Sequence, residues 1–302
     1  MFDTIVLKAS GIPLNEESIT RHTSILSKAT TYLNRDTRAL HTNYVMHDEQ
    51  IPYIKYADMS HTIELQLSIP KFLYGHNIAL ITETDIQTFF SKLQERLYEL
   101  FSIKVNHLDW IVKRIDVCRN FQVDKQVSDY IRMLGKQRFA YKNTNLTNQD
   151  ETVTFSNKSS SIMFYDKQKE VKDKKGSSDL VKLAKGILRL EIRPSYNDLK
   201  KYSPKRKAVE LLCPSFSDEV INKALRNVKY PSEIISLDLA WLKENKEDIS
   251  KIEMYLGFQT LLMMYDESTL REIYTPSTFA NRKSLIKKMT IPQGNCLKPL
   301  IS

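Results

Sequence analysis

Alternation of apolar and polar residues recurs through the first two-thirds of the chain and constrains its fold more than any other feature. It occupies six segments, at residues 4–7, 62–69, 110–120, 152–155, 161–165 and 187–193. A period of two places successive side chains on opposite faces of a strand, so each segment predicts a half-buried β-strand. Helical spacing of apolar residues lies between them, at 16–29, 84–101 and 125–134. Residues 1–198 therefore predict an α+β domain with a central, mostly antiparallel sheet flanked by helices.

The alternation stops after Pro194, and helical periodicity replaces it between residues 207 and 289. This change predicts an all-helical C-terminal domain over residues 199–302. The longest apolar stretch, residues 255–265, is shorter than the roughly 18 residues that a membrane span needs. The N-terminal MFDTIVLKASGIPL also lacks the basic start and apolar run of a signal peptide. We therefore expect a cytoplasmic protein with no membrane association.

The chain is basic, with 45 Lys and Arg against 36 Asp and Glu and a formal net charge of +9. Such an excess favours an anionic partner. Two stretches carry bases without acids, and each is explained equally well as a phosphate-binding patch or as a solvated face. Their candidate phosphate-binding residues are Lys200, Lys201, Lys205, Arg206 and Lys207 in the first stretch, and Arg282, Lys283, Lys287 and Lys288 in the second.

Three of the predicted strands carry an acid on their polar face. These acids are Glu64 in TIELQLSI, Asp116 in WIVKRIDVCRN and Glu191 in ILRLEIR. If the strands are neighbours in one sheet, the three carboxylates converge into an all-oxygen site suited to Mg²⁺ or Mn²⁺. A cation would relieve the repulsion between them. Taken singly, each acid is more simply explained as a surface or ion-paired residue.

A tyrosine, Tyr165, stands on the polar face of the predicted strand in SSSIMFYDKQKE. Because the ordinary phenol pKa is about 10, tyrosine attacks phosphorus only when its phenolate is stabilised. Lys167, two residues further on, is a candidate source of that charge. Three arginines on the polar faces are further candidates for phosphate contact: Arg114, Arg189 and Arg193. Tyr196 and Tyr202, which follow the last strand, are the alternative nucleophiles.

Several stretches, taken in order and spacing, resemble the gene II/X type of replication initiator of filamentous phages and plasmids. They are MFDTIVLKASGIPL, IELQLSIPKFLYGHN, KRIDVCRNF, TVTFSNKSSSIMFYDKQKEV, AKGILRLEIRP and YLGFQTLLMM. Similar RID, YxK and RxE elements occur in staphylococcal plasmid rolling-circle initiators and their mobilisation relatives. The resemblance implies a rolling-circle nickase fold, with the helical domain binding the origin or packing on the sheet.

By position, the resemblance implies that Tyr165 is the nucleophile and that Lys167 is the lysine that follows it. Asp116 and Glu191 match the acids of a Mg²⁺ (or Mn²⁺) site, and Glu64 is a less certain third. The implied reaction nicks one strand of supercoiled double-stranded origin DNA, forms a 5′-phosphotyrosine, and rejoins the strand after a round of synthesis. The implied partners are the origin DNA and a host helicase and polymerase, and an oligomer on the DNA is compatible with this scheme.

The chain lacks a His-hydrophobic-His triplet, so a histidine-ligated metal is not expected. His76, in the YGHN turn, has either a structural role or a role in binding DNA or metal. Two other functions remain open from the sequence. One is a non-catalytic DNA-binding replication regulator, and the other is a mobilisation relaxase that uses the same chemistry.

Overall fold

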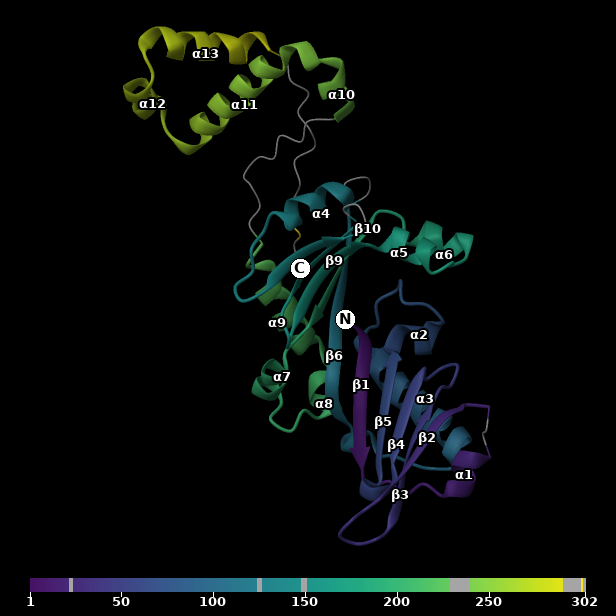
Figure 1. Ribbon diagram of the computed structural model, residues 1–302. Helices are drawn as coiled ribbons and strands as arrows, with labels where there is room; N and C mark the ends of the chain where they lie inside the picture. The colour runs from purple at the N-terminus through teal and green to yellow at the C-terminus, as the bar shows by residue number, and fades with distance from the viewer. Residues whose placement is uncertain (22–23, 124–126, 148–150, 229–238, 290–299, 301–302) are drawn as a thin grey trace. The chain divides into compact units, whose positions relative to one another are not determined.

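The computed structural model describes residues 1–21, 24–123, 127–147, 151–228, 239–289 and 300. Contacts divide the chain into two compact units, residues 1–229 with 300–302, and residues 230–299. Within the described part, the larger unit is built on a ten-stranded sheet in the order β2-β3-β4-β5-β1-β6-β10-β9-β8-β7 (Figure 1). Neighbouring strands pair antiparallel throughout. The α+β prediction with an antiparallel sheet is confirmed.

The six predicted strands are all present, and the structure adds four more. The strands are β1 (Phe2–Ser10), β2 (Leu26–Leu33), β3 (Leu40–Met46), β4 (Tyr53–Ala57), β5 (Thr62–Ser68), β6 (Ile111–Gln122), β7 (Asn143–Thr147), β8 (Thr152–Ser156), β9 (Ser161–Asp166) and β10 (Ile187–Arg193). The helix predicted at 16–29 is wrong beyond residue 20, because α1 (Glu16–Thr20) ends there. Residues from Leu26 onward instead pair with β3 at the edge of the sheet.

A buried apolar row crosses the sheet at its centre. Phe2 lies opposite Val117, Val117 opposite Ile192, Ile192 opposite Ile162, and Ile162 opposite Phe155. Every one of these side chains is buried. Since directly paired residues point to the same face, this row fixes the core side of the sheet. The residues next to it in each strand, Glu191 among them, point to the other side.

Helices cover the core side. In the N-terminal half, α3 (Glu83–Phe101) begins with a capping box formed by Thr82 and Asp85, and it buries an apolar stripe that includes Phe89, Leu93 and Leu97. In the C-terminal half, α4 (Val127–Gly135) packs on β8 and β9, and α9 (Pro214–Leu225) packs on β6. The remaining helices of this unit are α2 (Ile69–Tyr74), α5 (Lys167–Asp173), α6 (Ser178–Leu183), α7 (Tyr196–Tyr202) and α8 (Ala208–Leu211).

The division by contacts falls at residues 229/230, whereas the sequence predicts a boundary at 198/199. Helices α7, α8 and α9 belong to the larger unit. The reason lies in the chain after α7: the N–H of Ala208 donates to the carbonyl of Trp110 at 2.9 Å, and Lys207 forms a β-bridge with Ile111. Segment 207–208 is thereby attached to the start of β6.

The smaller unit is helical, as expected. It contains α10 (Leu239–Glu244), α11 (Ile249–Met264), α12 (Glu267–Ile273) and α13 (Pro276–Lys288). Phe258, Leu270 and Phe279 form its buried cluster, with 5.5 Å between the two phenylalanine ring centroids. Among the residues that the structure describes, no helix has the length and apolar character needed to cross a membrane.

Candidate active site

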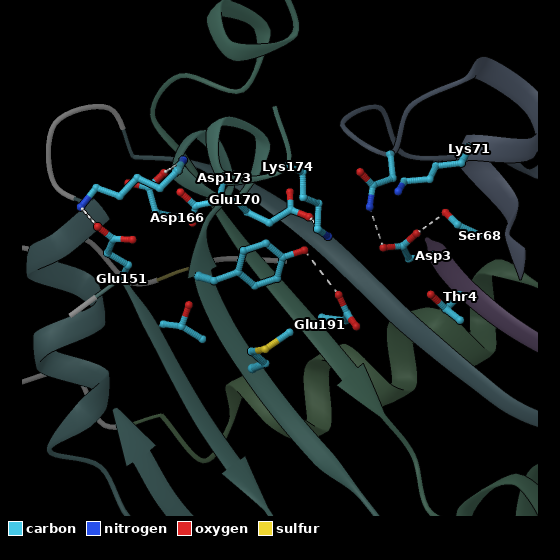
Figure 2. A pocket seen from close by; sticks show the side chains of 15 residues that line it. Asp3, Thr4, Ser68, Lys71, Glu151, Asp166, Glu170, Asp173, Lys174 and Glu191 are labelled. Carbon is cyan, nitrogen blue, oxygen red and sulfur yellow. Dashed lines mark hydrogen bonds and ion pairs between the residues drawn. The ribbon is translucent and has the colours of Figure 1, made fainter. Parts of the chain in front are cut away.

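Tyr165 borders a pocket of about 400 Å³ on the polar side of the sheet. Its side chain is 6% exposed, and its hydroxyl donates a hydrogen bond to Glu191 Oε2 at 3.4 Å. Figure 2 shows Glu191 and Asp3 bordering this same pocket, with Glu170 from α5 beside them. Burial raises the pKa of Tyr165 well above 10, and the charge of Glu191 adds to this effect. The tyrosine is therefore a phenol that needs a proton acceptor and positive charge before it can act as a nucleophile.

Glu191 is a buried acid that lies close to other carboxylates. Burial raises its pKa to about 7, and the neighbouring carboxylates of Asp3 and Asp116 contribute to the same shift. The guanidinium groups of Arg189 and Arg114 act in the opposite direction. An acid with a pKa near neutrality beside a phenol is suited to accept the phenolic proton.

Asp3 is an acid of this site that the sequence analysis missed. It is 4% exposed and accepts hydrogen bonds from Ser68 Oγ at 2.5 Å and Asn77 Nδ2 at 3.1 Å. The pairing of β1 with β6 shifts register between Phe2 and Ile5, so Asp3 sits at an irregularity of the strand. The available signal was an acid inside an alternating strand, the same signal that drew attention to Glu64, Asp116 and Glu191.

Arg189 lies inside the protein and is not a surface contact for phosphate. Its side chain is 0% exposed, with Nε donating to Asn120 Oδ1 at 2.8 Å and Nη2 donating to the Ile78 carbonyl at 2.9 Å. Within the described residues its Nη1 has no hydrogen-bond partner, and it lies 3.8 Å from Asp3 Oδ2. The positive charge of Arg189 lowers the pKa of Tyr165 and so favours the phenolate.

Lys167 is the second buried cation beside Tyr165. The strand ends at Asp166, which caps α5, so Lys167 is the first residue of that helix and does not continue the strand register. Its Nζ donates to Glu170 Oε2 at 2.8 Å and to Asn77 Oδ1 at 2.9 Å, and lies 5.8 Å from the Tyr165 ring centroid. Burial lowers its pKa, and Arg189 lowers it further.

The structure does not bring the three predicted carboxylates together. Strand β1 lies between β5 and β6, and Glu64 pairs with Lys113 Nζ at 2.7 Å. Ser68, which contacts Asp3, lies four positions beyond Glu64, about 13 Å along the strand at roughly 3.3 Å per residue. In the described portion of the chain, no group of three or more His, Cys, Asp or Glu residues is placed to hold a metal ion.

Asp116 is fully buried and is neutralised by two arginines. It accepts a hydrogen bond from Arg193 Nε at 3.0 Å and one from Arg114 Nε at 3.0 Å. Arg114 also makes a second, shorter contact through Nη2. Asp116 therefore holds Arg114 and Arg193 in place on the polar side of the sheet, and both of its carboxylate oxygens already accept hydrogen bonds from arginine.

A family model for the N-terminal part of a phage replication-associated protein, the gene II product, matches residues 15–213. The chain belongs to this family of phage replication initiators. A comparison with curated proteins finds no match. Among solved structures, the di-domain ARO/CYC StfQ from the steffimycin biosynthetic pathway is 7% identical and covers 74% of this chain and 93% of its own. Its TM-score is 0.23, too low to indicate a shared fold.

In the first basic stretch of this replication initiator, residues 200–207, two bases make contacts within the protein and three are exposed. Arg206 stacks over the Tyr196 ring at 4.4 Å and donates to the Val112 carbonyl at 2.8 Å, and Lys207 Nζ donates to the Leu108 carbonyl at 2.7 Å. These two bases attach the chain to the start of β6. The other three bases, Lys200, Lys201 and Lys205, are exposed and stay candidates for phosphate contact.

The second basic stretch of the initiator lies on α13 of the smaller unit. Lys283 pairs with Glu267 at 2.6 Å and lies 5.9 Å from the Phe279 ring centroid, so it contributes to the packing of α13 on α12. Lys287 and Lys288 are exposed, and Arg282 is half-buried.

The other candidate residues of the initiator, His76, Tyr196 and Tyr202, make contacts within the protein. His76 Nδ1 accepts a hydrogen bond from the Ile78 N–H at 3.3 Å, and its ring lies 6.3 Å from that of Tyr74. The Tyr202 hydroxyl is hydrogen bonded to Ser215 at 2.6 Å. Tyr196 is half exposed and is covered by Arg206. Of the three tyrosines considered, Tyr165 is the one that borders the pocket with Asp3 and Glu191.

Proposed function

We propose that this replication initiator nicks one strand of supercoiled origin DNA and becomes covalently attached to it through Tyr165. The observation that carries the proposal is the contact between the Tyr165 hydroxyl and Glu191, at 3.4 Å, in a pocket that also contains Asp3. Two buried cations, Arg189 and Lys167, lie beside the same phenol. A nucleophile, a proton acceptor and stabilising positive charge are the parts that attack on a phosphodiester requires.

In the proposed step, the hydroxyl of Tyr165 gives its proton to Glu191 Oε2 and the phenolic oxygen attacks phosphorus. A phosphorus–oxygen bond to tyrosine forms, the bond to the 3′-oxygen breaks, and the leaving 3′-oxygen takes up a proton from solvent. The products are a 5′-phosphotyrosine and a 3′-hydroxyl that a host polymerase can extend behind a host helicase. Attack by a 3′-hydroxyl on the phosphotyrosine reverses the step and rejoins the strand. Arg189 and Lys167 favour the phenolate throughout.

A divalent cation, Mg²⁺ or Mn²⁺, fits one part of this pocket. Mg²⁺ is commonly held by one or two carboxylates together with substrate phosphates. Asp3 and the second oxygen of Glu191 are suited to this role, because the charge of Asp3, after burial, contributes to the raised pKa of Glu191 and a cation would offset this repulsion. Asp116 and Glu64 do not fit, because basic side chains donate hydrogen bonds to their carboxylates, whereas Arg189 Nη1 lies 3.8 Å from Asp3 without a hydrogen bond. When bound, the cation would polarise a non-bridging phosphate oxygen.

The test uses supercoiled DNA of the protein's own replicon with Mg²⁺. We expect the unmodified protein to produce open circles with protein attached to the 5′ end, and Tyr165→Phe to bind DNA without nicking it. Tyr196→Phe and Tyr202→Phe are the matched controls and should nick normally. Nicking by Tyr165→Phe would reject the assignment. Binding without any nick by the unmodified protein, in Mg²⁺ and in Mn²⁺, would identify a non-catalytic regulator instead. Nicking confined to a transfer origin would identify a mobilisation relaxase.

A further inference from the structure

A second cavity, of about 380 Å³, lies at the other end of β9 and β10 from Tyr165. In the sheet, Tyr165 pairs with Arg189, whereas the cavity is reached at the pair formed by Ser161 and Arg193. The two cavities share no lining residue. The volume falls within the range of small-molecule sites. Its walls come from the ends of β9 and β10, the segment 139–142, α7 and α9.

The floor of this cavity is apolar. Ile162 and Ile192 face it from the sheet, on the side opposite to Glu191. Phe139 contributes from the segment after α4, and Phe216 and Ala224 contribute from α9. All five side chains are buried. The cavity exists because α4 covers β8 and β9 while α9 covers β6, which leaves the ends of β9 and β10 open between them.

The rim of the cavity is positively charged. Four bases line it: Lys142, Arg193, Lys201 and Lys223. The lining acids are Asp198 and Glu219. Asp198 is already engaged, since it accepts a hydrogen bond from Ser195 Oγ, the N-cap of α7, at 2.6 Å and pairs with Lys223 at 3.3 Å. Lys142 is half-buried, and burial lowers its pKa, as expected for an ammonium beside an apolar wall.

We propose that this cavity binds one unstacked nucleotide of a DNA strand, with the base against the apolar floor and the phosphate against the lysines of the rim. Apolar or aromatic surface combined with a basic groove is the usual way that proteins hold single strands. Arg193 lines the cavity and also contacts Asp116 on the polar side of the sheet. The site goes beyond the cleavage proposed above, since nucleotide binding there requires neither Tyr165 nor Glu191.

The first test follows the isoleucine methyl groups by NMR in the full-length protein with Tyr165→Phe, so that no cleavage can occur. A short single-stranded oligodeoxynucleotide should shift the Ile162 and Ile192 methyl signals at lower concentration than deoxyadenosine monophosphate. Deoxyribose 5-phosphate, which has no base, should shift them least. Equal effects of the nucleotide and the sugar phosphate would overturn the proposal. Tighter binding of the free nucleotide than of the strand would overturn the assignment to DNA.

Variants with matched controls make the test specific. Val220→Trp fills the cavity from a half-buried position on α9 and should abolish the methyl shifts, whereas Arg226→Trp, an exposed residue at the end of α9 and outside the lining, should not. Lys201→Ala should weaken oligonucleotide binding about fivefold, as expected for one exposed charged contact. Lys136→Ala, an exposed residue outside the lining, is its control. If a cavity variant and its control had equal effects, the proposed nucleotide site would be refuted. The proposal that Tyr165 cleaves DNA would not be affected.

Discussion

Of the two arginines that flank Glu191 on β10, only Arg189 should be essential for stability. Its guanidinium makes two charged hydrogen bonds, to Asn120 Oδ1 and to the Ile78 carbonyl, inside a fully buried site. Charged hydrogen bonds contribute about 1.5–3 kcal/mol each, and a lysine can replace one of the two, so Arg189→Lys should cost about 1.5–3 kcal/mol. The Ile78 carbonyl keeps its bond from Asn120 Nδ2 at 2.9 Å, which limits the loss.

Arg193→Lys is the matched control, because Arg193 has a partly exposed side chain and Asp116 keeps its bonds to Arg114. Its expected cost is below about 1 kcal/mol. Urea unfolding is the assay, followed by the fluorescence of Trp110, which is buried in the larger unit. A Trp241→Phe background removes the other tryptophan. Equal losses of unfolding free energy for the two lysine variants would refute the assignment of Arg189 as the structural cation.

Three further predictions concern charge. Asp48→Asn should lower the unfolding free energy by about 3 kcal/mol, because Asp48 is buried against Arg96. Burial disfavours the charged form of Asp48, but hydrogen bonds from Arg96 and the Ile51 N–H outweigh burial and lower the pKa of Asp48. The stabilisation by this carboxylate is therefore present above about pH 4 and is lost as the pH falls further. Asp48→Asn should not show this loss of stability at low pH. Glu191→Gln should reduce nicking by about 10²- to 10⁴-fold without loss of DNA binding in gel shifts, and an unchanged rate would contradict its role as proton acceptor. Origin affinity should fall steeply with salt in anisotropy titrations, and salt-independent binding would contradict phosphate contact.

The sequence predicts most of the strands that have one buried face, although it misses β4, in which Ile54 and Tyr56 are buried. β5 and β10 alternate cleanly, because each has a core face and a polar face. β2 has no buried residue and pairs only at the edge of the sheet, so its sequence carries no alternation that would separate it from a helix. β7, at the opposite edge, was missed for the same reason.

The polar side chains of the candidate site were assigned to the correct face, but not to the correct neighbours. The alternation in the sequence predicts that the side chains of Glu64, Asp116 and Glu191 point away from the core face of their strands, and the structure agrees. It does not state which strand lies beside which. The insertion of β1 between β5 and β6 separates Glu64 from the other two acids. The pairing of β1 with both β5 and β6 joins segments that are far apart in the sequence, and no local sequence pattern predicts it.

The same insertion of β1 explains why Asp3 belongs to the pocket. Because β1 pairs with β5 on one side and β6 on the other, its first residues reach the level of Glu191 on β10 and of Ser68 at the end of β5. Asp3 then joins segments that are far apart in the sequence, since it accepts hydrogen bonds from Ser68 and Asn77 and lies 3.8 Å from Arg189. An acid near the chain terminus, outside the segment that matches the family, becomes part of the candidate active site through sheet order alone. The order of the strands therefore places Asp3 beside Glu191 in the pocket, and the local sequence around Asp3 does not predict this position.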